Sequence, residues 1–201
     1  MSPIQAKELL VVHRACAFGW VATLEHLLGA AGHCFNVNTR DSEGNTPLHV
    51  AVAAHNFPAV RVLLHHGADI AAVTGTGDTP MHIACDSSVQ NATRLLWCPR
   101  LKYYTSNAQC MYESENDVRI VGLFLRHNID YHSVDFDGWT ALDKVKSNQN
   151  REIREMVYGD VKKRRLEAFL MAKVPRLGHK SGASDLNDDE IRMIGTYLGI
   201  Q

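Results

Sequence analysis

Few residues of this chain have types and spacings that could do chemistry. His82 and Cys85 stand three positions apart on one expected helix and could both ligate a metal ion. Cys98 and Cys110 have no nearby histidine, so a zinc site built on them would need unusual partners. The sequence has no glycine-rich phosphate loop, nucleophile elbow, HExxH motif or paired CxxC motif. We therefore expect no catalytic, cofactor-binding or metal-binding residues, and we interpret Cys85 as a core residue.

The composition argues against several classes of protein. The chain has 201 residues, of which 45% are hydrophobic and 21% charged, as is typical of a soluble globular protein. Its 21 basic and 22 acidic residues give a net charge of -1, which argues against a globally basic binder of nucleic acid or membranes. No apolar run approaches the roughly 20 residues that span a bilayer, and the first residues do not form a secretory signal pattern. With five irregularly spaced cysteines, these features predict reduced thiols in a cytoplasmic or nuclear protein.

The chain contains an internal repeat. Residues 44–51, GNTPLHVA, recur 33 positions later as GDTPMHIA at residues 77–84. A weaker copy, GWTAL, lies at residues 138–142, and a degenerate one, VHRA, lies at residues 12–15. A period of 33 residues with a TPLHxA motif resembles the ankyrin repeat family, and the resemblance covers roughly residues 5–145.

The second unit of the repeat shows the expected elements most clearly. Thr46 can cap a helix whose first turn holds Pro47, and a second helix is expected over about residues 59–65, ended by Gly67. Each helix pair must stack on a neighbour to bury its apolar face. We therefore expect an all-α ankyrin-repeat solenoid of about four helix-turn-helix units. The resemblance implies that the histidines shared by the repeats hydrogen-bond the turns and do not bind metal: His13, His49 and His82.

The third unit is interrupted by an insert of about 28 residues. The insert covers roughly residues 86–113 and separates the first helix of the unit from the second, expected over residues 121–127. It is rich in residue types found at interfaces, so it either contacts a partner or packs back onto the solenoid. Its candidate contact residues are Trp97, Tyr103 and Tyr104.

The resemblance also implies where a partner binds. In ankyrin proteins the turns between units project as fingers, which form a concave binding surface with the inner helices. The candidate partner-binding residues on the fingers are Ser42, Glu43, Asn45, Thr76, Asp78, Phe136, Asp137 and Trp139. The aromatic members either anchor a partner or pack on the insert or the C-terminal tail. Residues 113–143 are rich in acidic side chains, which fits either a basic partner or a solvated acidic face.

The C-terminal part of the chain departs from the repeat. We expect the solenoid to cover residues 5–158 and a helical extension to cover residues 159–201, with Gly159 ending one helix and Asp160 capping the next. The basic run KKRR at residues 162–165 fits a nuclear localisation signal, a nucleic-acid patch or, as we favour, a solvated helix face.

The final segment, from residue 186, has two interpretations. It fits a helix that caps the open end of the solenoid, which is the interpretation we favour. It also weakly resembles the opening of an F-box, the motif that binds the adaptor subunit of cullin-type ubiquitin ligases, although an asparagine replaces the proline of that motif. The candidate adaptor-binding residues are Leu186, Ile191, Ile194 and Leu198.

These observations lead to one principal hypothesis and one alternative. We expect a non-catalytic protein-interaction module, an adaptor or a subunit of a larger assembly, which binds a protein partner through the fingers, the inner helices and the insert. The alternative is a substrate receptor of a cullin-type ubiquitin ligase. An enzyme would require a cleft with a perturbed titratable pair, and no motif points to one. Membranes and nucleic acids are not expected partners.

Overall fold

The computed structural model describes residues 3–29, 36–86, 107–127 and 129–177. The chain divides into two compact units, Met1–Arg154 and Glu155–Gln201. In the described ranges the regular elements are helices, apart from one antiparallel bridge between Val134 and Thr140. The helices are α1 (Pro3–Phe18), α2 (Val21–Gly29), α3 (Pro47–Ala53), α4 (Phe57–His65), α5 (Pro80–Cys85), α7 (Asn107–Arg126), α8 (Ala141–Ser147) and α9 (Arg151–Leu177). None of these helices combines the length and the hydropathy that a bilayer-spanning segment requires.

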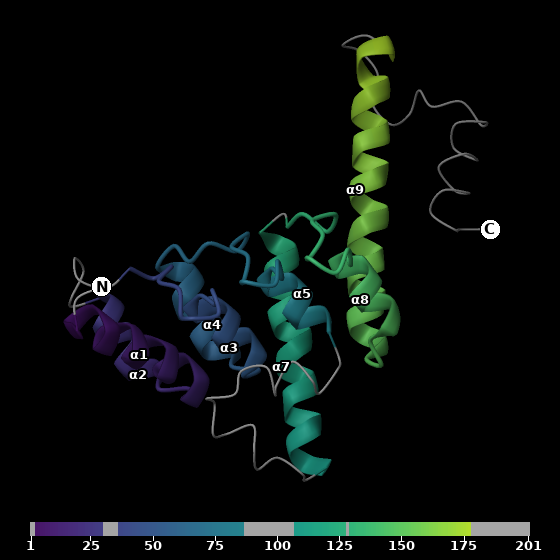
Figure 1. The fold of residues 1–201 in the computed structure, drawn as a ribbon. Coiled ribbons are helices and arrows are strands. Elements are labelled where there is room, and N and C mark those ends of the chain that lie inside the picture. The colour runs from purple at the N-terminus through teal and green to yellow at the C-terminus, as the bar shows by residue number, and fades with distance from the viewer. Residues whose placement is uncertain (1–2, 30–35, 87–106, 128, 178–201) are drawn as a thin grey trace. The chain divides into compact units, whose positions relative to one another are not determined.

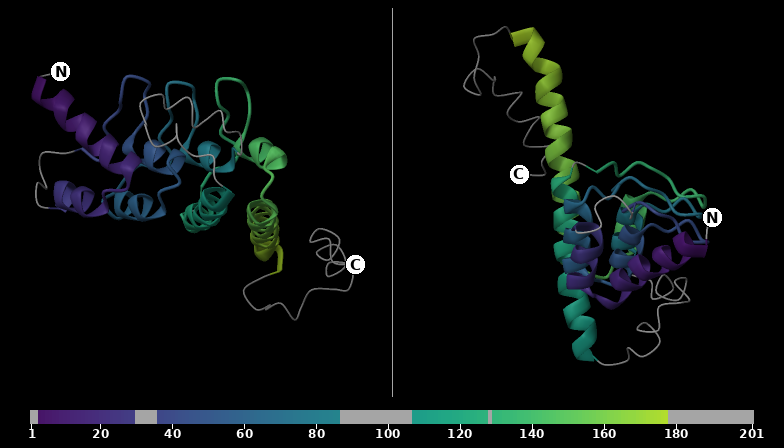
Figure 2. Two further views of the ribbon diagram at one scale, coloured as in Figure 1. Left: turned by 90° about the horizontal axis from the view of Figure 1, so that it is seen from below. Right: turned by 90° about the vertical axis from the view of Figure 1, so that its left-hand side faces the viewer.

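The helices of the first unit follow one another in pairs (Figure 1). Along the chain, α1 packs on α2, α3 on α4 and α5 on α7. Neighbouring pairs then stack, so that α1, α3, α5 and α8 form an inner row and α2, α4 and α7 an outer row. In the left view of Figure 2, the loops before α3, α5 and α8 project side by side from the inner row. The predicted all-α ankyrin-repeat solenoid is confirmed.

The core of the first unit consists of the apolar positions that the repeat places between the rows. Leu48 on α3, Leu63 on α4 and Met81 on α5 are fully buried, and so is Phe124 on α7. Because a single helix pair has no other surface against which to bury these side chains, stacking on the neighbouring pair stabilises each unit.

Each inner helix that follows a finger begins at a threonine with the same local geometry. Thr46, Thr79 and Thr140 are the N-caps of α3, α5 and α8, and each forms a capping box with the residue three positions later. The predicted cap at Thr46 and the left-handed glycine after α4 are both confirmed, because Gly67 has a φ of +81°. The predicted second helix of this unit begins slightly earlier, at Phe57.

Successive fingers are hydrogen-bonded to each other through their backbones. The Gly75 N–H donates to the Glu43 carbonyl at 2.8 Å, and the Phe136 N–H donates to the Thr76 carbonyl at 3.0 Å. The backbones approach so closely that only glycine fits at the contact. A Cβ on Gly77 would lie 2.9 Å from the backbone nitrogen of Phe136. The three fingers therefore support each other as a continuous, rigid edge.

We expect Gly77→Ala to destabilise the chain more than Gly138→Ala. Both glycines have a left-handed φ, +84° and +82°, so either substitution should cost about 1 kcal/mol. Only the Cβ at Gly77 would also meet the next finger, whereas nothing within 4 Å meets one at Gly138. We expect a total loss of about 3 kcal/mol for Gly77→Ala in urea unfolding. Equal losses for the two variants would contradict the close contact between fingers.

Two further helices differ from their predicted boundaries. The second helix of the third unit, α7, begins at Asn107, so the last part of the expected insert, residues 107–113, belongs to this helix. Trp97, Tyr103 and Tyr104 lie outside the described residues.

The predicted helix break at Gly159 is wrong, because α9 runs without interruption from Arg151 to Leu177. A glycine inside a helix costs about 1 kcal/mol relative to alanine. Favourable pairs one turn apart offset that cost, among them Arg164 with Asp160 at 2.7 Å. The predicted boundary between solenoid and extension, after residue 158, falls inside α9, as does the division between the two units after Arg154.

Candidate partner-binding surface

Three histidines at the same repeat position connect each unit to the next finger. In each case the ring Nε2 lies 3.0 to 3.2 Å from a backbone carbonyl oxygen of that finger. The pairs are His13 with Asn45, His49 with Asp78 and His82 with Trp139. The predicted structural role of these histidines is confirmed, and each of them holds the base of a finger in place.

The hydrogen bonds of His49 define its tautomer. The Thr46 N–H lies 3.1 Å from Nδ1 and can only donate, so Nδ1 carries no proton and Nε2–H donates to the Asp78 carbonyl. Burial of the ring lowers the pKa of His49 to about 4, despite the carbonyl that favours the charged form. Burial likewise lowers the pKa of His82, with the nearby Lys144 charge acting in the same direction. The buried position thus favours the neutral form of the imidazole, which makes the hydrogen bonds described above.

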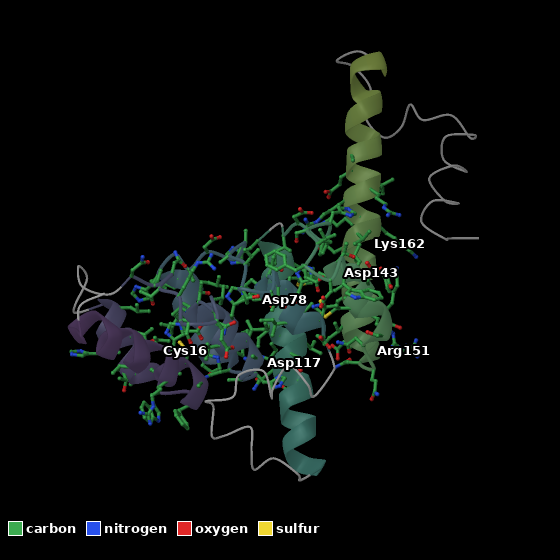
Figure 3. All side chains as sticks on the ribbon, in the orientation of Figure 1. Cys16, Asp78, Asp117, Asp143, Arg151 and Lys162 are labelled. Atoms are coloured by element: carbon green, nitrogen blue, oxygen red, sulfur yellow. The ribbon has the colours of Figure 1, made fainter. Side chains whose placement is uncertain are left out.

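Two free cysteines lie in the described core. Cys16, labelled on α1 in Figure 3, and Cys85 on α5 are buried, and burial raises the pKa of both thiols. Across the described ranges, no group of three or more His, Cys, Asp or Glu side chains is arranged to hold a metal ion.

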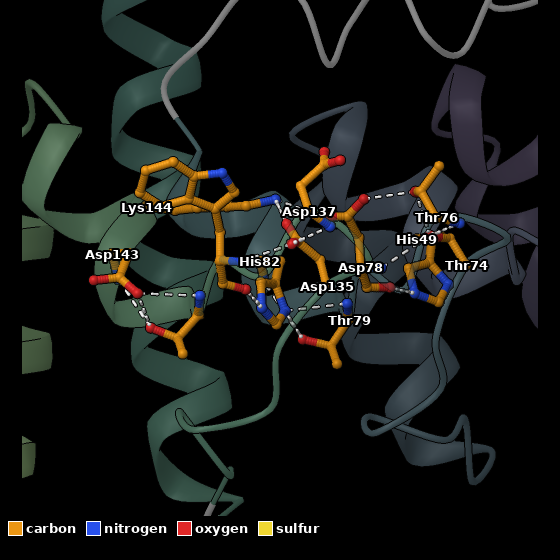
Figure 4. A network of polar contacts seen from close by, with 12 residues as sticks. His49, Thr74, Thr76, Asp78, Thr79, His82, Asp135, Asp137, Asp143 and Lys144 are labelled. Carbon is orange, nitrogen blue, oxygen red and sulfur yellow. Dashed lines mark hydrogen bonds and ion pairs between the residues drawn. The ribbon is translucent and has the colours of Figure 1, made fainter.

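A buried lysine connects the last two fingers (Figure 4). The Lys144 Nζ atom lies 2.5 Å from Asp78 Oδ1 and 2.9 Å from Asp135 Oδ2, and all three side chains are largely buried. Burial alone would lower the pKa of Lys144, but hydrogen bonds to the two carboxylates outweigh it and raise the pKa. Burial would likewise raise the pKa of Asp135, but its hydrogen bond with Lys144 reverses the direction. This triad was not predicted.

In the first turn of α8, the histidine position of the repeat is occupied by an aspartate. Asp143 accepts hydrogen bonds from the Thr140 N–H at 3.2 Å and the Thr140 hydroxyl at 2.6 Å. The hydrogen bond from Lys146, followed by those from Thr140, lowers the pKa of Asp143 to about 2. The carboxylate therefore reproduces the local cap, but it has no N–H with which to donate to a further finger.

Among the described residues, the three most exposed large apolar side chains lie on the last finger. Phe136 is 78% exposed, Val134 58% and Trp139 57%. Their backbones are fixed, because the Phe136 N–H donates to the second finger and the Trp139 N–H donates to Asp135 Oδ1 at 2.8 Å. Exposed aromatic side chains on a fixed backbone lose less entropy when they dock than those on a mobile loop, so they are suitable anchors for a partner.

The structure separates the predicted contact residues into exposed and buried sets. Asn45 and Asp78 are buried, at 6% and 7% exposure, and their polar groups are used inside the array, so neither is available to a partner. We call the exposed set the finger surface, and it consists of Ser42, Glu43, Thr76, Val134, Phe136, Asp137 and Trp139. Sequence reasoning missed Val134, which lies two residues before Phe136 and is also exposed.

Comparison with known proteins agrees with this architecture. Residues 12–107 match the family model described as "Ankyrin repeats (3 copies)". The chain is 35% identical over 79 residues to human BCL-6 corepressor-like protein 1, an alignment that covers 39% of this chain and 4% of that protein. It is 40% identical over 55 residues to human ankyrin repeat and SOCS box protein 18, covering 27% of this chain and 12% of that protein. The chain thus spans only a small part of the length of these relatives.

A solved structure shows the same fold. The ankyrin repeat domain of Bcl-3 superposes with a TM-score of 0.52 at 18% sequence identity, covering 73% of this chain and 50% of that one. A solenoid of stacked helix pairs, whose finger loops are bridged by histidines, is the architecture of ankyrin repeats. Residues 12–107 therefore match ankyrin repeats, and the described helices form an ankyrin-repeat solenoid.

Proposed function

We propose that this chain is a non-catalytic interaction module of the cytoplasm or nucleus, an adaptor or a subunit of a larger assembly. Ankyrin repeats are protein-protein interaction modules, which supports the general class of function. The observation that carries the specific proposal is the exposure of Phe136 and Trp139 on hydrogen-bonded finger backbones. The partner docks its apolar side chains on these two rings, and the exposed carboxylates of Glu43 and Asp137 favour basic groups beside them.

We expect the double variant Phe136→Ala with Trp139→Ala to lose most of its partner while its stability hardly changes. Both rings are largely exposed, so removing them leaves no cavity in the core. The free energy of unfolding should therefore change by less than about 1 kcal/mol. Loss of two aromatic anchors should weaken binding by at least about tenfold. Quantitative affinity purification from the source cell, with wild type and variant tagged identically, measures the partner, and urea unfolding measures the stability.

The matched control is Trp20→Ala. Trp20 is also half exposed, at 49%, but it lies in the turn between α1 and α2, away from the fingers, where it stacks on Phe18. We expect this variant to retain the partner. Equal recovery of the partner by the finger variant and the wild type would contradict the proposal, and so would an equal loss in the Trp20 control.

A second candidate function is supported by one of the relatives. A protein named for a SOCS box beside its ankyrin repeats suggests a link to ubiquitin ligases, which fits the substrate-receptor hypothesis. The candidate adaptor-binding residues, Leu186, Ile191, Ile194 and Leu198, lie outside the described residues. A chain that ends at Gly182 should then lose a ligase adaptor selectively and keep the partner of the finger surface. Recovery of the same proteins by both chains would leave the adaptor function without support.

A further inference from the structure

A groove on the outer row of helices is lined by apolar side chains and arginines, whereas the finger surface carries carboxylates. It lies between α2, α4 and α7, on the row that faces away from the finger loops in the left view of Figure 2, and its volume is about 680 Å³. Its apolar lining side chains include Val21, Phe57, Pro58, Val62 and Leu123. A groove of this size can hold a short stretch of peptide with one or two apolar side chains.

The charged side chains that line this groove are predominantly basic. The arginines are Arg61 and Arg119, against the single acidic residue Glu25, and three histidines line the groove beside them: His65, His66 and His127. The finger surface, in contrast, contains the carboxylates of Glu43 and Asp137, and the exposed Arg40 beside it donates to the Gly44 and Val73 carbonyls. The two sides of the array thus favour partner groups of opposite charge, although the whole chain has a net charge of only -1.

The two arginines are placed to recognise carboxylates. The guanidinium carbon of Arg119 lies 4.2 Å from the centre of the Phe57 ring, a stacking contact that holds the side chain in place. Stacking uses the face of the guanidinium and leaves the N–H groups at its edge able to bind a carboxylate in a bidentate manner. Arg61 lies one turn before His65 on α4, and both are exposed. Among the described residues, neither arginine forms an ion pair with a carboxylate.

We propose that the outer groove binds an acidic peptide segment of a partner protein. Aspartate or glutamate carboxylates of that segment bind Arg61 and Arg119, and its apolar side chains contact Phe57 and Leu123. This site is separate from the finger surface, so one chain can hold two protein segments of opposite charge on opposite sides of the repeats.

The test uses the full chain and a fluorescein-labelled peptide built from glutamate and leucine. We expect the peptide to bind in fluorescence anisotropy at low salt, and Arg61→Glu with Arg119→Glu to weaken binding by at least about tenfold. Arg61→Glu alone, which keeps the stacked pair of Arg119 and Phe57, should weaken binding by a smaller factor. Circular dichroism establishes that both variants remain folded.

The control variant is Arg126→Glu, which makes the same charge change on α7 at an exposed residue that does not line the groove. We expect it to bind like the wild type, as should the Phe136 and Trp139 double variant. The proposal is overturned if the wild type does not bind the peptide, or if a peptide with lysine in place of glutamate binds equally well. An equal loss of binding in the Arg126 variant also overturns it. A concentration-dependent dimer that Arg61→Glu abolishes would show that a second copy of the chain occupies the groove, and it would overturn the proposal as well.

Discussion

Replacing His49 with alanine is expected to lower the free energy of unfolding by about 3 kcal/mol. The substitution leaves the buried Thr46 N–H without its acceptor and removes a fully buried ring, which creates a cavity. The Asp78 carbonyl loses one of two hydrogen bonds, because it also accepts from the Thr74 N–H at 2.9 Å. Urea unfolding followed by circular dichroism measures the loss. His132→Ala, at an exposed position, is the control and should change stability by less than about 0.5 kcal/mol. A loss below about 1 kcal/mol at His49 would contradict the bridging role.

The same histidine makes stability depend on pH, and the sign follows from its lowered pKa. In the unfolded chain the ring has its ordinary pKa of 6.5, whereas in the folded chain its pKa is about 4. Between these values the unfolded state binds more protons than the folded state. The contribution of His49 to the free energy of unfolding is therefore fully present above pH 6.5 and is lost as the pH drops towards 4. His49 alone accounts for about 3 kcal/mol of this fall, and His82 acts in the same direction. Asp143, with a pKa of about 2, contributes only at lower pH. The His49→Ala variant should lose much of this dependence, and an unchanged pH profile would contradict the assignment.

Lys144→Met is expected to destabilise the chain by about 4 kcal/mol at neutral pH. Without the ammonium group, the Asp78 and Asp135 carboxylates remain buried, at 10% and 4% side-chain exposure, and repel each other. Burial then raises the pKa of Asp135, because the hydrogen bond that lowered it is lost. The folded variant should therefore take up a proton more readily than the unfolded chain, so lowering the pH restores part of this loss. Urea unfolding at several pH values measures both effects.

Lys146→Met is the matched control for this prediction. Lys146 lies on the same helix and forms an ion pair with Asp143 at 2.6 Å, but its side chain is 65% exposed. Exposed pairs of this kind contribute at most about 1 kcal/mol, so the control should unfold almost like the wild type. Similar small losses in the two variants would show that the buried triad does not stabilise the junction between the last two fingers.

The parts of this molecule that sequence analysis could predict are those governed by local, periodic rules. The repeated TPLH-type motif predicts the threonine cap, the proline in the first turn and the shared histidine role, because each is repeated at a fixed offset. The pairing of Lys144 with Asp78 joins residues 66 positions apart in different units. No periodicity indicates such a pair, because it depends on how the fingers stack. For the same reason Asn45 and Asp78 resemble surface residues in the sequence, although long-range packing buries them.

The end of a helix was equally hard to predict from local signals. Gly159 followed by Asp160 has the pattern of a helix end and a new cap, yet α9 continues through both. A glycine costs a helix only about 1 kcal/mol, so a few favourable pairs, such as Asp160 with Arg164, are sufficient to keep the helix intact. The outer groove also escaped prediction, because its two arginines come from distant segments, Arg61 from α4 and Arg119 from α7.

The most direct test of the proposed binding surface is hydrogen–deuterium exchange of the full chain, alone and in complex with the recovered partner. The finger amides that are not already in hydrogen bonds should become protected on binding, in residues 41–45, 74–78 and 134–139. Protection there, lost again in the Phe136 and Trp139 variant, is the result that we predict. Protection confined to the outer helices, or fingers that exchange at the same rate in both states, would contradict the assignment of the finger surface as the site that binds the partner.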